Sequence, residues 1–181
     1  MVGINQAGEQ TTLRGGLFMS LKYFSLISGI VLMIIGVAGF FPAMVSPLPE
    51  TAPKLAIVYG SGLLWGTFPV NILSNLFHTL FGVWGASCFG STYAARSYAR
   101  ATAVTMGILA IFGFIPVLNT VLGLMPVQGN NIWLHGLVAV SAAWFGYASS
   151  ASELVRKADK FVPGEKPRVA SESKPEQKRA S

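Results

Sequence analysis

Charged residues are scarce in this chain of 181 residues: Asp, Glu, Lys and Arg make up only 11% of it. A soluble domain carries about 25%. Hydrophobic residues make up 52% of the chain, which excludes a disordered protein. The single cysteine, Cys88, excludes a scaffold held by disulfides. Because so few charges cannot cover a soluble globule, the remaining class is an integral membrane protein whose first partner is the lipid bilayer.

Acidic residues are absent from the long apolar runs, and this absence narrows the function. A transporter coupled to protons or cations usually buries carboxylates at mid-membrane. The sequence also lacks a phosphate-binding loop, a nucleotide-binding glycine fingerprint and a Cys-x-x-Cys pair. No basic patch is interleaved with aromatic residues, so nucleic acid is not an expected partner. We therefore expect a protein that is not an enzyme.

Four apolar runs are each long enough to cross a bilayer core of about 30 Å, which takes about 20 helical residues. These predicted spans cover residues 21–44, 70–89, 101–124 and 132–152. Residues 1–20 form a polar extension with little expected order, and residues 153–181 form a charged tail that cannot bury enough surface to fold. The predicted fold is an all-α integral membrane protein, a bundle of four transmembrane helices.

Basic residues are distributed unevenly around the predicted spans. All but one of the 13 Lys and Arg residues fall on one side, and only Lys54 falls on the other. Since loops rich in Lys and Arg stay in the cytoplasm, both termini are predicted to be cytoplasmic. The segment 45–69 then lies outside. Its prolines and glycines interrupt it, and we expect a short interfacial or re-entrant helix within it.

Polar residues line one face of the second and fourth spans. Asn71, Asn75 and His78 lie at positions i, i+4 and i+7, and Asn131 and His135 lie four residues apart. Helical geometry places each set on one face, and polar residues at membrane depth face the bundle interior or water. Because the two spans run in the same direction, the two histidines are predicted to face each other at a common depth.

Three roles are open for His78 and His135. In a structural role, each ring hydrogen-bonds a neighbouring asparagine or a loop carbonyl, and we favour this role because no third metal ligand such as Cys, Asp or Glu lies within reach in the spans. In a second role, the pair ligates haem or another tetrapyrrole, holds a metal or hydrogen-bonds a quinone. Proton transfer is the third. Asn71 and Asn75 are expected to donate hydrogen bonds between helices.

Small residues form stripes on the first, second and fourth spans, and we expect these three spans to pack against one another along them. The connection between the second and third spans carries Arg96 and Arg100 together with Tyr93 and Tyr98. Long basic side chains and tyrosines favour the membrane–water interface. These four residues are therefore predicted to be interfacial anchors.

Several short motifs recur along the predicted spans, at residues 29–31, 36–40, 66–71, 75–78, 82–85, 95–98 and 131–135. Together these motifs resemble the DUF4383 family of bacterial membrane proteins. The resemblance extends over about residues 21–150. It implies four spans in a bacterial inner membrane, or in a thylakoid membrane if the source is a cyanobacterium. It directs attention to His78 and His135, and it implies no activity.

Three functions follow from these observations as expectations. The small size, the glycine stripes and the lack of a catalytic set favour a non-enzymatic accessory or assembly subunit that packs on a larger membrane complex. The alternative is a cofactor-binding membrane protein that uses the two histidines. A weaker alternative is a protein for small-molecule permeation or sensing, lined by the stripe of asparagines and histidines.

Overall fold

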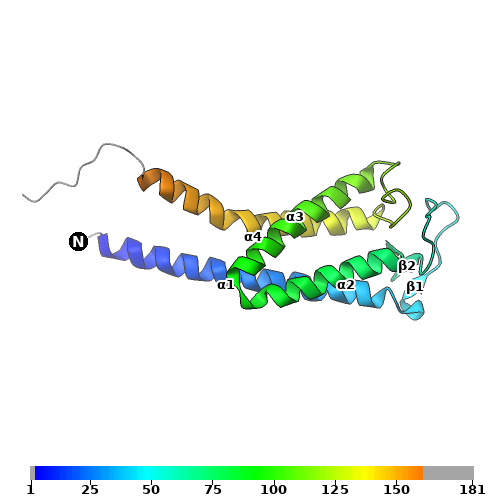
Figure 1. Ribbon diagram of the computed structural model, residues 1–181, viewed down its shortest axis with the longest axis horizontal. Coiled ribbons are helices and arrows are strands. Elements are labelled where there is room, and N and C mark those ends of the chain that lie inside the picture. The colour runs from blue at the N-terminus through cyan, green and yellow to red at the C-terminus, as the bar shows by residue number, and fades with distance from the viewer. Residues whose placement is uncertain (1–2, 161–181) are drawn as a thin grey trace, which may run out of the picture.

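The computed structural model describes residues 3–160, with side chains from residue 20 to residue 148. Four long helices dominate this part of the chain: α1 (Gly3–Ala38), α2 (Ile72–Ser87), α3 (Thr92–Phe114) and α4 (Asn130–Lys160). Successive helices run in opposite directions, so the Gly3 end of α1 and the Lys160 end of α4 point the same way (Figure 1). The helices pack mainly as two pairs, α1 on α2 and α3 on α4.

Three of the helices are long and apolar enough to cross a membrane: Ser20–Ala38, Ile72–Gly90 and Thr92–Phe114. The structure is mostly helical, and three of the four predicted spans are helices of sufficient length and hydropathy to cross a membrane. The described part of α4 is not among them. Its first turns carry Asn130, Asn131 and His135, which lower its mean hydropathy.

Glycines allow the backbones of α1 and α2 to approach closely, as the stripes of small residues predict. A Cβ atom built on Gly29 would lie 2.5 Å from the backbone nitrogen of Ala86, and one on Gly82 would collide with the backbone nitrogen of Met33. Backbone atoms cannot move aside as the end of a flexible side chain can. Only glycine therefore fits at these two positions without separating the helices.

The small face of α4 packs differently from the prediction. A Cβ atom on Gly146 would lie 3.1 Å from the Arg100 side chain of α3, and α4 contacts α3 far more than α1. The predicted joint packing of the first, second and fourth spans along their small faces is therefore wrong for α4. The reason is that α3 starts early enough to offer its own small residues, such as Ala99, to α4.

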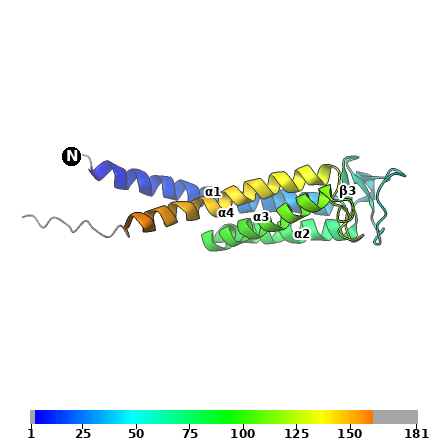
Figure 2. The same cartoon turned by 90° about the horizontal axis from the view of Figure 1, so that it is seen from above.

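A small antiparallel sheet occupies segment 45–69, where we expected a short helix. The strands are β1 (Val45–Ser46), β2 (Gly62–Leu64) and β3 (Phe68–Val70), in the order β1-β2-β3. Trp65 and Gly66 have φ values of 51° and 68°, which form the tight turn between β2 and β3. Pro69 is tolerated because β3 is an edge strand. The sheet covers one end of the bundle (Figure 2).

Helix α3 begins and ends earlier than the predicted third span, 101–124. The short 3-10 helix Cys88–Gly90 precedes it, and Ser91 caps it by accepting a hydrogen bond from the backbone N–H of Ala94. It ends at Phe114 because Ile115 precedes Pro116 and is extended, with φ −98° and ψ 113°. Pro116 thus terminates the helix, and turns follow it.

Helices α1 and α4, the first and the last, extend beyond the expected spans at the end of the bundle far from the sheet. Helix α1 begins at Gly3, inside the segment 1–20 for which we expected little order, and it ends at Ala38 rather than at residue 44. A 3-10 turn, Pro42–Met44, replaces the last predicted turn because Pro42 cannot continue the helix. Helix α4 continues past residue 152 to Lys160. The rest of the predicted tail lies outside the described residues.

Candidate functional site

Asn71 joins the start of α2 to two loops. Its backbone is extended, its side-chain oxygen accepts from the backbone N–H of Ser74, and the Ser74 hydroxyl accepts from the Asn71 backbone N–H. This is a capping box, which satisfies two N–H groups at the helix start. The Asn71 amide nitrogen donates to the carbonyl oxygens of Ile57, at 3.0 Å, and Leu124, at 2.7 Å. Asn71 is therefore a structural donor.

Asn131 has the same role at the start of α4. Its amide nitrogen donates to the carbonyl oxygens of Pro69, at 2.7 Å, and Pro126, at 2.9 Å. The side chain is almost fully buried. Asn131 therefore ties strand β3 and the turn before α4 to the helix bundle.

Asn75 links α2 to the end of α1. Its amide nitrogen donates to the Gly39 carbonyl oxygen at 2.7 Å. A Cβ atom on Gly39 would collide with the Asn75 carboxamide, so a larger residue there would displace Asn75 from this hydrogen bond. Since the Gly39 carbonyl only accepts, the amide nitrogen faces it, and the other carboxamide atom is the oxygen. That oxygen is buried and has no hydrogen-bond partner.

The structure brings the two histidines together, in the facing arrangement that the helical stripes predict. The Nε2 atoms of His78 and His135 are 3.4 Å apart. The rings stack, with centroids 5.6 Å apart and an interplanar angle of 21°. Both side chains are buried, and the edge of Phe77 contacts the His78 ring. The pair therefore lies in the interior, between α2 and α4.

The hydrogen bonds of the pair assign its tautomers when both rings are neutral. His78 Nδ1 lies 2.8 Å from the Ser74 carbonyl oxygen, which only accepts, so the proton of His78 is on Nδ1. Its Nε2 atom then accepts, and His135 must donate from its own Nε2. The Nδ1 atom of His135 is left as a buried acceptor without a partner. The observed pair is thus a directed chain from His135 through His78 to Ser74.

The donor set around the histidines does not fit haem. Two axial Fe–N bonds of about 2 Å each would place the ring nitrogens about 4 Å apart on opposite faces of a porphyrin. The two Nε2 atoms are instead in direct contact at 3.4 Å, so no macrocycle fits between them. Such a separation does suit two ligands of one tetrahedral ion. Among the described residues, however, no three His, Cys, Asp or Glu side chains gather to complete such a site.

The predicted interfacial anchors separate into exposed and buried residues. Tyr93 is 83% exposed, as an anchor would be, whereas Tyr98 is fully buried. The Tyr98 ring packs edge-on against Trp84, with centroids 5.4 Å apart. The anchor role predicted for Tyr98 is therefore wrong, because helix α3 begins before it and turns it into the core.

Arg100 also faces a protein partner. Its Nε atom donates to the Gly146 carbonyl oxygen at 3.0 Å, and its guanidinium lies 5.2 Å from the centre of the Tyr147 ring. These contacts hold α3 against α4. Arg96 is half-buried on the preceding turn of α3, so neither arginine stands free as a simple lipid anchor.

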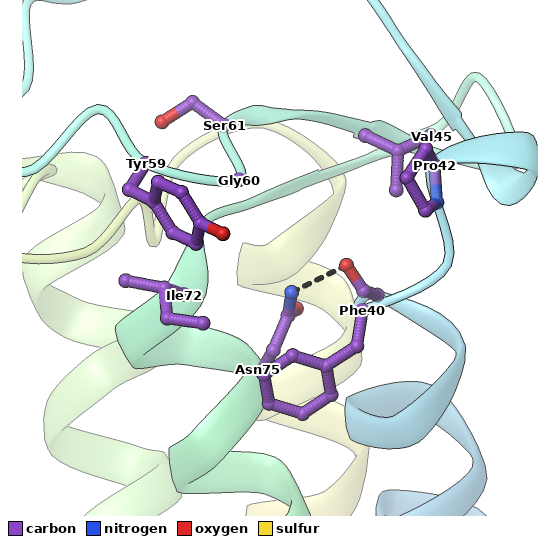
Figure 3. A pocket seen from close by; sticks show the side chains of 9 residues that line it. Phe40, Pro42, Val45, Tyr59, Gly60, Ser61, Ile72 and Asn75 are labelled. Atoms are coloured by element: carbon purple, nitrogen blue, oxygen red, sulfur yellow. Dashed lines mark hydrogen bonds between the residues drawn. The ribbon is translucent and has the colours of Figure 1, made fainter.

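A cavity of about 420 Å³ lies beside Asn75, where the end of α1 meets the sheet and the start of α2. Figure 3 shows Phe40, Tyr59 and Ile72 around it, with the Asn75 carboxamide rising toward it from α2. Sequence reasoning missed this cavity, and it also missed Ser74. The spacing Asn71-x-x-Ser74 is a capping signal that points to Ser74. No local pattern points to the cavity, because its walls come from distant segments.

The comparisons with known proteins identify one family. The sequence model described as "Domain of unknown function (DUF4383)" matches residues 22–148. No curated protein and no solved structure matches the chain. The matched region contains both histidines, Asn71, Asn75 and Asn131, and, apart from Ser20 and Leu21, all three of the helices that are apolar enough to span a membrane. The chain therefore belongs to the DUF4383 family.

Proposed function

We propose that this protein is a four-span bacterial inner-membrane protein, cytoplasmic at both ends, that acts without catalysis as an accessory or assembly subunit of a larger membrane complex. The fourth span in this proposal is α4. The polar residues that lower its hydropathy, Asn131 and His135, are almost fully buried in the bundle. The side of α4 that would meet lipid is apolar. The mean hydropathy of the whole helix is therefore lower than the hydropathy of that side.

The uses of the polar side chains support a non-catalytic role. Asn71 and Asn131 donate to loop carbonyls, and His78 donates to the Ser74 carbonyl. A catalytic group needs an accessible atom near a place where substrate binds. These side chains instead form hydrogen bonds that hold the sheet and the loops to the helices.

The observation that carries the proposal is an outward seam on α4. It consists of five apolar residues, each between 47% and 72% exposed: Trp133, Leu137, Val140, Trp144 and Tyr147. Their spacing alternates between four and three residues, the repeat of one continuous helix face. The exposed residues Ile27, Ile30, Ile34 and Val37 of α1 share this repeat, and the seam on α4 differs from them by the open glycine beside it. The seam from Trp133 to Tyr147 is about 21 Å long, at about 1.5 Å per helical residue.

A small residue beside the seam supports a helical partner rather than lipid alone. Gly136 adjoins the seam, and a Cβ atom built there would meet nothing within 4 Å. Gly29 and Gly36 of α1 and Gly82 and Gly85 of α2 face a neighbouring helix, whereas Gly136 faces open space. Small residues let membrane helices approach closely. We infer that an apolar helix of a partner protein packs on this seam.

The test is site-specific photo-crosslinking in native membranes. A photoreactive phenylalanine analogue replaces Leu137 in the seam or, as a matched control, Ile34, which is 54% exposed on α1. We expect a discrete protein adduct from position 137 and none from position 34. In addition, Gly136→Leu should abolish the adduct without lowering the melting temperature. Labelling of lipid alone from both positions, or one common adduct, would contradict the proposal.

Cofactor binding remains the second candidate function because the two histidines are buried, adjacent and partly unsatisfied. The 3.4 Å separation of their Nε2 atoms opposes haem and would suit two ligands of a tetrahedral ion. An absorbance spectrum and metal analysis of protein purified from native membranes test this candidate. A Soret band, or one equivalent of a metal lost in His135→Phe, would favour it over the accessory role.

A further inference from the structure

The α3–α4 connection, residues 115–129, carries no charge. It lies within a longer stretch, residues 101–152, that contains no Asp, Glu, Lys or Arg. Segment 45–69 lies at the same end of the bundle and does contain charges, Glu50 and Lys54. Part of this charged segment extends further from the helices than the α3–α4 connection does (Figures 1 and 2). The uncharged connection is therefore the part of this end that stays nearer to the apolar helices.

The side chains of the α3–α4 connection are arranged differently from those of a loop in water. Its exposed residues are all apolar or glycine, and Val117, Leu122 and Leu124 are 74%, 71% and 46% exposed. Thr120, in contrast, is only 7% exposed, and its hydroxyl oxygen accepts from the backbone N–H of Gly123. The connection thus turns a polar side chain inward and presents an apolar surface.

The backbone of the connection satisfies its polar groups within the protein, although it is not helical. Backbone N–H groups donate to carbonyl oxygens of the same connection at Leu118, Asn119, Val121, Leu124, Met125 and Val127. The Gly123 carbonyl accepts from the N–H groups of Ala56 and Ile57, and the Leu124 carbonyl accepts from the buried side chain of Asn71. Non-helical backbone is tolerated at membrane depth only where the protein supplies such bonds in place of water.

The hydrogen bond from Asn71 fixes the depth of the connection. Asn71 immediately precedes α2, so Leu124 lies level with the start of that helix. The span Ile72–Gly90 has 19 residues, which rise about 28 Å in helical geometry, close to the core thickness of about 30 Å. A charged group marks its far end, where the Lys22 ammonium donates to the Gly90 carbonyl. The opposite boundary of the hydrocarbon core therefore falls at the level of the connection.

We propose that the α3–α4 connection is immersed in the lipid leaflet on the side of the sheet, where Val117, Leu122 and Leu124 contact acyl chains. Lipid fits this surface because the surface carries no charge and the backbone behind it is already hydrogen-bonded. The bundle thus continues its contact with lipid beyond Phe114, where α3 ends. This lipid contact is separate from the seam on α4 and does not depend on the accessory role.

The test measures the depth of spin labels in vesicles of phosphatidylcholine and phosphatidylglycerol that contain this chain alone. A nitroxide is attached to the new thiol of Val117→Cys or Leu122→Cys and, as a matched control, of Thr51→Cys, an exposed position of segment 45–69. The native thiol, Cys88, is buried, and the chain without an added cysteine gives the background. Collisions of each label with oxygen, which concentrates in lipid, are compared with collisions with a neutral nickel complex, which stays in water.

We expect the logarithm of the ratio of oxygen to nickel collisions to be positive at positions 117 and 122 and negative at position 51. All three positions are exposed, so the labels leave the core intact, and the melting temperature of each labelled chain checks this. A negative value at position 117 or 122, or a value at position 51 as positive as theirs, would overturn the proposal. Because the vesicles hold no other protein, a failure of the accessory role leaves this result unchanged.

Discussion

Adding one methyl group at Gly82 tests the close packing of α1 on α2. In Gly82→Ala, the new Cβ atom collides with the backbone nitrogen of Met33 and lies 2.6 Å from both the Met33 Cα and the Gly29 carbonyl oxygen. Ordinary contacts of a Cβ atom begin near 3.4 Å, which is 0.8 Å more than 2.6 Å, so the two backbones must separate by close to an ångström. Overpacking of this kind costs about 1–3 kcal/mol.

The expected result is a lower melting temperature in detergent. A cost of about 2 kcal/mol corresponds to a drop of about 4–8 °C for a chain of this size. The control is Gly136→Ala, also a helical glycine, where the added Cβ atom meets nothing within 4 Å. Alanine is the better helix former by about 0.5–1 kcal/mol, so this variant should melt at the same temperature or higher. A Gly82→Ala protein that melts like the wild type, or a Gly136→Ala protein that loses as much, refutes the reasoning.

Three further predictions concern the polar residues and the topology. His78→Phe and His135→Phe should each lower the free energy of unfolding by about 1–3 kcal/mol, because one buried ring loses its hydrogen-bond partner. The double variant should lose less than the sum of the two. Additive losses in thermal unfolding would show that the rings are independent. Asn71→Ala should lower the free energy of unfolding by about 2 kcal/mol, because the helix cap and the bonds to the loops are lost. Asn130→Ala, at an exposed site with one hydrogen bond of 3.3 Å, should lower it by less than about 0.5 kcal/mol. Reporter fusions should report the outside at Asn130 and the cytoplasm at Ser181, and an outside signal at Ser181 would contradict the four-span topology.

The inward placement of the polar stripes was predictable from sequence, because a polar side chain at membrane depth faces the bundle interior or water. His78 and His135 show this, since helical spacing alone made them face each other. The bounds of α3 were not predictable by hydropathy. The predicted third span starts at residue 101, after the charge of Arg100. In the structure Arg100 lies within α3, where it donates to the Gly146 carbonyl and its guanidinium lies over the Tyr147 ring.

The sheet and the cavity were beyond local reasoning for another reason. Strands β2 and β3 have three residues each, too few for an alternating pattern, and Pro69 lies within one of them. The cavity joins Gly39, Tyr59 and Asn75, which come from three separate segments. Only the folded chain brings these three residues together around one cavity.

The hydrogen bonds of Asn71 and Asn131 constrain the order in which the protein can mature. Asn71 donates to the carbonyl of Leu124, and Asn131 donates to the carbonyl of Pro69, so each bond joins an early segment to one that leaves the ribosome much later. The sheet therefore lacks its tie to α4 while only the first helices have entered the bilayer. Until α4 is inserted, the Pro69 carbonyl stays without this donor, and its pairing requires that α4 has reached its place beside the sheet.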